Sequence, residues 1–315
     1  MRVAYQIQEG PDASRQVAEG ALALAVSDWD GVHQAHVALA RRAAAAASAL
    51  GGQAIAVLPW PTPDGGDGAP DIRLTTLEER IARLDALGCF DTLVVAPTPA
   101  EARAPQAAVA WLRGFGDVRA LLGEAHATGA MARLWPDGLA SAARALGVTV
   151  EQRDDVSEQG ARIREMVEAG RMREATAALG YTYSMTGEVV GGDRRGRLLG
   201  FPTANVRAEP SKLPPRDGIY AAWAHLPGAH APWPAVISIG VRPTFGQGAR
   251  RQVEAHLLDA TMDLYGIQLR LEFVEWLRAE LRFDNVEALI EQMCADREQS
   301  REILRTEAAA MGGGQ

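Results

Sequence analysis

The chain has 315 residues, of which 47% are hydrophobic and 23% charged, and its formal net charge is -8. This length is typical of two domains, each with enough apolar residues to build a core. Neither half is basic, which argues against nucleic acid as a partner. The sequence has no signal-peptide pattern and no apolar run of about 18 residues, so we expect a cytoplasmic protein that does not act at a membrane.

The basic residues limit the possible phosphate chemistry. All but one of the 32 basic residues are arginine, and the single lysine is Lys212, in the segment EPSKLPP. P-loop NTPases, protein kinases and Schiff-base enzymes each need a lysine in a defined structural context. A proline-flanked loop is none of these contexts, so the sequence excludes all three classes. The two cysteines, Cys89 and Cys294, lack the spacing of a disulfide framework or a zinc site.

The first half alternates short apolar runs with alanine-rich stretches of helical periodicity, the pattern of a parallel sheet with crossover helices. We expect an α/β domain here, with helices at 37–50, 76–87, 106–113 and 138–146. Strands are expected at 2–7, 21–26, 53–58, 92–96 and 148–151.

The second half changes character. Residues 157–179 are a charged helical stretch broken at Gly170, which predicts a connector. Apolar runs separated by Gly and Pro turns then predict a small antiparallel barrel, followed by an amphipathic helix at 286–304. The strands are expected at 184–190, 218–225, 235–241, 253–258 and 268–273.

The most informative segment is GGDRRGRLLGFPTAN, residues 191–205. Its glycines allow backbone amides to approach an anion closely, which lets a chain almost without lysine hold phosphates. Thr203 and Asn205 are two apart and share one face of an extended segment. A hydroxyl and an amide carbonyl suit Mg²⁺, although a turn with two satisfied polar side chains explains these residues at least as well.

A second segment, VEAHLLD at residues 253–259, places Glu254 and His256 on one side of a strand. A carboxylate on a rigid strand can orient and deprotonate an attacking hydroxyl, as phosphoryl transfer requires. Taken alone, Glu254 is more readily explained as a solvated residue of the strand face, and His256 as structural rather than catalytic.

Together these segments resemble the riboflavin kinase module of the bacterial bifunctional riboflavin kinase/FAD synthetases. The resemblance implies a six-stranded antiparallel β-barrel with a terminal helix, which transfers the γ-phosphoryl group of ATP to the terminal ribityl hydroxyl of riboflavin and so produces FMN. The motifs that carry it, in the family's order, are LGFPTAN, DGIY at 217–220, SIGVRPTF at 238–245, VEAHLLD, DLYG at 263–266 and LEF at 271–273.

The resemblance also implies roles for single residues. Thr203 and Asn205 bind magnesium and nucleotide, and Glu254 is the catalytic base beside the flavin. Ser238 stands where family members usually have Asn. The remaining nucleotide-binding residues are Gly192, Gly196, Arg197, Gly200 and Pro202, and the remaining flavin-binding residues are Arg242, Thr244 and Phe245.

The first half resembles the family's Rossmann-like nucleotidyltransferase domain, which joins FMN to AMP. The family pattern G-x-F-D-G-V-H-x-G-H corresponds to SDWDGVHQAH at residues 27–36, which keeps Asp30, His33 and His36. Ser27 and Ala35 replace the two glycines, and each adds a Cβ where the backbone should approach the nucleotide.

Further departures follow downstream. Thr62 stands in place of a histidine, residues 123–129 lack the family's Asp and both aromatics, and QGARIR at 159–164 keeps only Arg164 of a triphosphate motif with three hydroxyls. Each lost hydroxyl removes roughly 1–3 kcal/mol of hydrogen bonding to phosphate. We therefore expect a riboflavin kinase with a degenerate adenylyltransferase domain. The alternatives are a bifunctional enzyme that also makes FAD, and a non-catalytic flavin- or nucleotide-binding regulatory protein.

These interpretations divide the chain into four parts. Expected are a FAD synthetase-like domain at 1–156, a helical connector at 157–180, a riboflavin kinase domain at 181–308 and a tail at 309–315.

Overall fold

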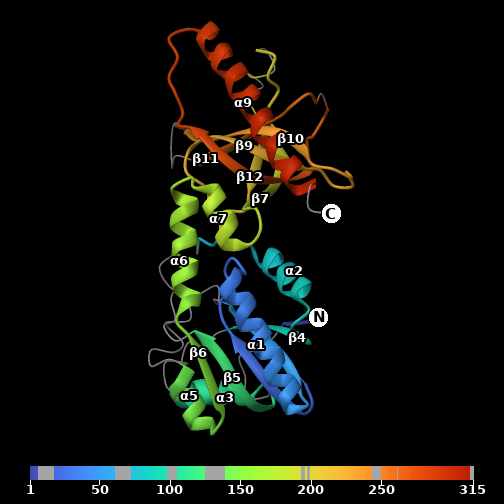
Figure 1. Ribbon diagram of the computed structural model, residues 1–315, viewed down its shortest axis with the longest axis vertical. Coiled ribbons are helices and arrows are strands. Elements are labelled where there is room, and N and C mark those ends of the chain that lie inside the picture. Colours follow the sequence, from blue (N-terminus) through green and yellow to red (C-terminus); the bar gives the residue numbers. More distant parts are fainter. Residues whose placement is uncertain are drawn as a thin grey trace. The chain divides into compact units, whose positions relative to one another are not determined.

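The computed structural model describes residues 1–5, 18–60, 72–97, 105–124, 139–192, 196, 199–242, 250–260 and 262–312. The chain divides into two compact units, Met1–Arg162 and Ile163–Gln315 (Figure 1). In the part of the chain that the structure describes, no helix combines the length and the apolar character needed to cross a membrane.

The first unit is built on a six-stranded parallel sheet with the strand order β1-β4-β3-β2-β5-β6. Because β3 and β4 lie on one side of β2 while β5 and β6 lie on the other, the order reverses between β2 and β5. The strands are β1 (Arg2–Tyr5), β2 (Ala21–Val26), β3 (Gln53–Trp60), β4 (Thr92–Pro97), β5 (Asp117–Glu124) and β6 (Thr149–Arg153). The helices between them are α1 (Gln34–Leu50), α2 (Leu77–Leu87), α3 (Pro105–Arg113) and α5 (Leu139–Leu146).

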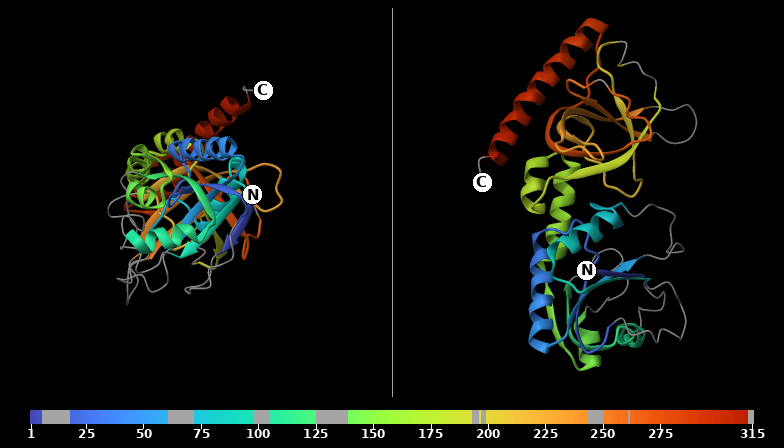
Figure 2. Two further views of the ribbon diagram at one scale, coloured as in Figure 1. Left: turned by 90° about the horizontal axis from the view of Figure 1, so that it is seen from below. Right: turned by 90° about the vertical axis from the view of Figure 1, so that its right-hand side faces the viewer.

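Helices cover both faces of this sheet (Figure 2). Leu22, Leu24 and Val26 of β2 pack on the face that carries α3 and α5, while Ala23 and Ala25 pack on the face of α1 and α2. Successive side chains of a strand point to opposite faces, so a strand buried on both sides reads as one continuous apolar run. The carboxyl ends of the strands on the two sides of such a reversal are the usual ligand position in folds of this kind.

The second unit contains a closed antiparallel barrel with the strand order β10-β11-β8-β7-β12-β9. The long helix α9 packs on it through Leu304, which contacts Ala221 and Val274. The elements are α6 (Asp155–Glu168, which crosses the boundary between the units), α7 (Met172–Leu179), β7 (Ser184–Val190), β8 (Ala204–Ala208), β9 (Gly218–His225), β10 (Trp233–Arg242), β11 (Arg250–Leu257), β12 (Gln268–Arg278) and α9 (Val286–Gly312).

The only lysine has a structural place in this unit. Lys212 is 4% exposed, and its ammonium lies 4.8 Å from the centre of the Tyr183 ring. The Tyr183 hydroxyl donates to the carbonyl oxygen of Leu213 at 2.6 Å. The ring is therefore held by this hydrogen bond and by the ammonium over its face. A cation over an aromatic face is a stabilising contact. Lys212 thus serves packing, in agreement with the exclusion of lysine-dependent phosphate sites.

The structure confirms the fold class predicted from the sequence and corrects three details. Two strands were missed, β5 and β8. β5 carries Arg119 among its apolar residues, and β8 has five residues of which Asn205 and Arg207 are polar, so neither shows a clear strand pattern. The expected tail at 309–315 is wrong for residues 309–312, which continue α9 to Gly312. Alanine is the best helix former, and this segment begins with alanines.

The fully buried Leu24 of β2 tests the packing of the parallel sheet. We expect Leu24→Ala to lower the free energy of unfolding of the first unit by about 2–5 kcal/mol, because it leaves a cavity between the sheet and α3. Leu50, 41% exposed at the end of α1, is the matched control, and Leu50→Ala should cost about 0.5 kcal/mol. Urea denaturation followed by circular dichroism measures both, and equal losses would contradict the assignment of Leu24 to the core.

Candidate functional site

Three neighbouring strands of the barrel bring the predicted kinase residues together. Ser238 of β10 pairs with Glu254 of β11, and Glu254 pairs with Asn205 of β8, so the three form one row across the barrel. Thr203 directly precedes β8, and its hydroxyl donates to Glu254 Oε2 at 3.3 Å. The structure therefore places Thr203, Asn205 and Glu254 in one small region.

A cavity of about 240 Å³ opens at this row. Apolar side chains of β9, α9 and the segment before α9 form much of its wall. Its polar lining residues are Thr203, Ser238, Glu254, His256, Arg278, Glu280 and Asp296. A largely apolar wall with a few convergent polar groups is typical of a small-molecule site. The apolar lining residues include Phe201, Ile219, Val236, Phe283, Leu289 and Met293.

The glycine-rich segment is in close contact with this region. A Cβ built on Gly192 would lie 2.1 Å from Asn205 Nδ2, and a Cβ on Gly196 would lie 2.3 Å from the carbonyl oxygen of Phe201. The carbonyl of Gly196 accepts the backbone N–H of Phe201 at 2.8 Å. Gly200 has φ +85°, a conformation that side chains other than glycine rarely adopt. At these positions the glycines are needed for contacts within the chain itself, which the sequence alone did not predict.

His256 holds the segment before β8 in place. Its Nδ1 lies 2.8 Å from the carbonyl oxygen of Pro202, and its ring meets the ring of Phe201 edge-on at 5.4 Å. Burial lowers the pKa of His256, which keeps the imidazole neutral. With the proton on Nδ1, His256 donates to Pro202 and fixes the residue next to Thr203.

Sequence reasoning missed Glu280, which lines the same cavity. A Cβ on Gly240 would lie 2.2 Å from its carboxylate oxygen, so the side chain crosses directly over β10. Its pKa is raised by burial, and then by the negative charges of Asp217 and Glu254. No motif pointed to Glu280, since it lies in the segment between β12 and α9 and becomes a neighbour of Glu254 only when the barrel closes.

The other predicted flavin and nucleotide residues are only partly described. Arg242 ends β10, but its side chain lies outside the described part of the structure, as do Arg197, Thr244 and Phe245. The roles of these four residues stay predictions.

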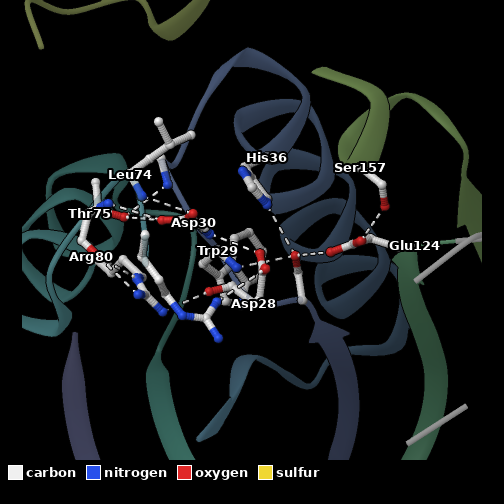
Figure 3. A network of polar contacts seen from close by, with 12 residues as sticks. Asp28, Trp29, Asp30, His36, Leu74, Thr75, Arg80, Glu124 and Ser157 are labelled. Carbon is white, nitrogen blue, oxygen red and sulfur yellow. Dashed lines mark hydrogen bonds and ion pairs between the residues drawn. The ribbon is translucent and has the colours of Figure 1, made fainter. Parts of the chain in front are cut away.

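In the first unit, the loop between β2 and α1 is held by Asp30 (Figure 3). Its carboxylate accepts the backbone N–H groups of Leu74 and Thr75 and the Thr75 hydroxyl, all at 3.0 Å. Trp29 and Val32 in this loop have φ values of 54° and 38°, which are unusual for residues with a Cβ. Asp30 therefore stabilises a strained loop, and its carboxylate is already occupied by this task.

The carboxyl ends of β2 and β5 are joined by a second network, in which Glu124 is central. Its two oxygens accept hydrogen bonds from the hydroxyls of Ser27 and Ser157, each at 2.5 Å (Figure 3). Ser27 Oγ also lies 3.1 Å from His36 Nε2. Burial, followed by the charge of Asp28, raises the pKa of Glu124 to about 7. Ser27 stands where the family pattern has glycine, and its hydroxyl thus takes the Nε2 atom of His36 as a hydrogen-bond partner.

The N-terminus of α1 is occupied as well. The backbone N–H of Ala35, in its first turn, donates to Gln159 Oε1 at 2.9 Å. Burial lowers the pKa of His33 to about 4, and burial lowers the pKa of His36 well below its usual value. Both imidazoles are therefore neutral at pH 7 and add no positive charge to the helix end. Arg164 lies farther along α6, in the second unit, so its role stays a prediction.

Comparison with known proteins agrees with the arrangement of the barrel. Residues 179–304 match the family model described as riboflavin kinase (flavokinase). A bifunctional riboflavin kinase/FMN adenylyltransferase of Bacillus subtilis is 29% identical over 290 residues, which cover 88% of this chain and 90% of the relative. Most of this chain is therefore similar to this relative, and residues 179–304 are similar to the riboflavin kinase family.

Other relatives align over less than half of the chain. The Listeria monocytogenes and Escherichia coli riboflavin kinase/FMN adenylyltransferases are 36% and 37% identical, over 44% and 45% of this chain and 44% of each relative. A Streptococcus pneumoniae structure described as a macrolide-efflux protein matches 96% of this chain with a TM-score of 0.78 at 22% identity. That likeness supports the fold alone. Residues 179–304 thus match the riboflavin kinase family, and an α/β unit precedes them in the chain.

The contact of Gly192 with Asn205 predicts an effect on catalysis. In Gly192→Ala the new Cβ must displace the Asn205 amide, so we expect FMN formation to fall about 10²-fold, the usual effect of misplacing an active-site group by about 1 Å. Gly191→Ala is the matched control, because a Cβ there meets nothing within 4 Å. Flavin separation after incubation with riboflavin, ATP and Mg²⁺ measures both variants. If both retained normal activity, the position of Asn205 would not matter.

Proposed function

We propose that the second unit transfers the γ-phosphoryl group of ATP to the ribityl 5′-hydroxyl of riboflavin, with Glu254 as the catalytic base, and that the first unit no longer makes FAD. The observation that carries the first part is the row of Ser238, Glu254 and Asn205 beside the Thr203 hydroxyl at the mouth of one cavity. A flavin ring suits the apolar wall of this cavity.

The chemistry assigned to Glu254 is a single proton transfer. As the 5′-hydroxyl oxygen bonds to the γ-phosphorus, the bond from that phosphorus to the bridging oxygen of ADP breaks, and the hydroxyl proton passes to the Glu254 carboxylate. A base fixed on a strand keeps the hydroxyl in line with the bond that breaks. Thr203, which now donates to Glu254 at 3.3 Å, would turn that hydroxyl toward the nucleotide.

The donor set of Thr203 and Asn205 fits Mg²⁺ bound with ATP. A hydroxyl and an amide carbonyl are hard oxygen donors, and they leave room for phosphate oxygens and water. The side chain of Asn205 is held by the close approach of Gly192, so its carbonyl is preorganised. When bound, Mg²⁺ supplies neutralisation of the phosphate charge, which this chain cannot supply with lysine.

The role of Glu254 can be tested by Glu254→Gln. We expect kcat to fall by about 10²–10⁴-fold with KM for riboflavin little changed, because the amide keeps the shape and loses the base. Glu188→Gln is the control, since Glu188 lies on β7 of the same barrel with its side chain 46% exposed. Steady-state FMN formation gives both constants. Near-normal kcat in Glu254→Gln would refute Glu254 as the base.

The second part of the proposal rests on the groups that fill the first unit's crevice. Ser27 bonds His36, Gln159 caps the helix that would meet a triphosphate, and Glu124 adds a buried carboxyl group nearby. A helix N-terminus attracts phosphate through its free N–H groups, and here the N–H of Ala35 already has a partner. A bifunctional enzyme remains the second candidate, because Asp30, His33 and His36 are retained.

The loss of adenylyl transfer predicts a simple product pattern. With riboflavin, ATP and Mg²⁺ the purified protein should form FMN and no FAD, and with FMN and ATP it should release no pyrophosphate. Chromatography of the flavins and a coupled pyrophosphate assay measure the two products. FAD formed at a rate within about ten-fold of FMN formation would establish the bifunctional alternative.

We further propose that these reactions take place in the cytoplasm and that the partners are ATP and riboflavin, without nucleic acid. Cys89 and Cys294 are both free thiols, as is usual in a reducing compartment.

A further inference from the structure

We propose that the first unit binds one divalent transition-metal ion, such as Zn²⁺, through Asp28, His36 and Glu124. One ligand atom from each of these side chains lies within 4.8 Å of the others, the only such group found in the described part of the chain. They come from three segments that meet at the carboxyl ends of β2 and β5: the loop after β2, the first turn of α1 and the last residue of β5 (Figure 3).

The donors are of the right chemical kinds. Two carboxylates and one imidazole suit Zn²⁺ and its first-row neighbours better than Mg²⁺ or Ca²⁺, which prefer oxygen alone. Bonds of about 2.0–2.1 Å place the ligands of a tetrahedral Zn²⁺ about 3.3 Å apart, so modest inward movements of the side chains would close the site. Ser27 Oγ lies among the donors, 3.1 Å from His36 Nε2 and 2.5 Å from Glu124 Oε1, and offers a fourth oxygen.

The tautomer of His36 is not fixed by a second hydrogen bond. The side chain is 1% exposed, its Nε2 faces Ser27, and its Nδ1, on the other side of the ring, has no hydrogen-bond partner among the described residues. Because no hydrogen bond at Nδ1 fixes the tautomer, the proton can move to Nδ1 and free the Nε2 lone pair for a metal. Ser27 Oγ would then lose its donor and could also turn to the ion.

The local composition favours a cation over an anion. Asp28, Asp30 and Glu124 bring three carboxyl groups to the surroundings of the His36 imidazole. Arg73 reaches one oxygen of Asp28 at 3.3 Å, which leaves lone pairs of that carboxylate for a metal. A crevice that binds phosphate in the related enzymes would thus carry the opposite preference here. This inference does not depend on kinase activity in the second unit.

The test is calorimetric titration of Zn²⁺ into the full-length protein after removal of metals with a chelator, in the absence of nucleotide. We expect one saturable site in the wild-type protein, and at least a ten-fold loss of affinity in Glu124→Gln and in His36→Gln. Loss of an outer partner of a metal ligand already costs 10–100-fold, so loss of a ligand should cost no less. Glu78→Gln is the matched control, because Glu78 is exposed on α2 of the same unit. The Zn²⁺ affinity of this variant should equal that of the wild type.

Two outcomes would overturn the proposal. One is the absence of a saturable Zn²⁺ site in the wild-type protein at micromolar concentrations. The other is an unchanged Zn²⁺ affinity in both Glu124→Gln and His36→Gln, which would show that the ion binds at a different site. Thermal melting of the metal-free variants checks that they fold, and Asp28→Asn is available if one does not. Zn²⁺ should raise the melting temperature of the wild type and not that of the ligand variants. The FAD assay is independent, so either hypothesis about the first unit can fail without the other.

Discussion

The barrel and its active site both depend on the pairing of β8, the five-residue strand Ala204–Ala208, with β7 and β11. β8 is the link between these two strands, so without it the barrel would be open on one side. The same register sets Asn205 opposite Glu254. A slip by one residue would turn Asn205 to the other face, because side chains alternate along a strand. One ladder therefore supplies both the closure of the barrel and the pairing of Asn205 with Glu254.

The candidate sites of the two units differ in how far their polar groups are engaged within the chain. In the barrel, Gly192 and Gly196 leave no space for a side chain, and Thr203 and Glu254 are among the polar residues that line the cavity. In the α/β unit, Ser27 and Gln159 donate to or accept from the very groups that could meet a ligand. Such internal hydrogen bonds stabilise the unit in the absence of a ligand, because the groups that they pair need no hydrogen-bond partner from a ligand. The first unit can then persist as a folded structure after its original chemistry is lost.

Sequence reasoning predicted the layers of the fold because these depend on local patterns. The uninterrupted apolar run of β2 and the alternation in β7 each identify a strand without knowledge of its neighbours. Thr203, Asn205 and Glu254 could be predicted because they lie in short motifs. Glu280 and Glu124 could not, since each acquires its role from a partner far away in the sequence: Glu280 from Gly240 and Glu124 from Ser27. The surroundings of both carboxyl groups are a property of the folded chain.

The scarcity of lysine bears differently on the two proposed sites. The barrel needs no ammonium group, because backbone, hydroxyl and amide oxygens with a metal ion can carry the charge of the phosphates. The α/β unit must otherwise rely on arginine, and its buried arginines are already engaged: Arg80 donates to the carbonyls of Thr75 and Asp28, and Arg73 pairs with Asp28. With its cations committed and Glu124 added, that crevice has an excess of carboxyl groups. A bound metal ion would balance them at the place where a nucleotide could not.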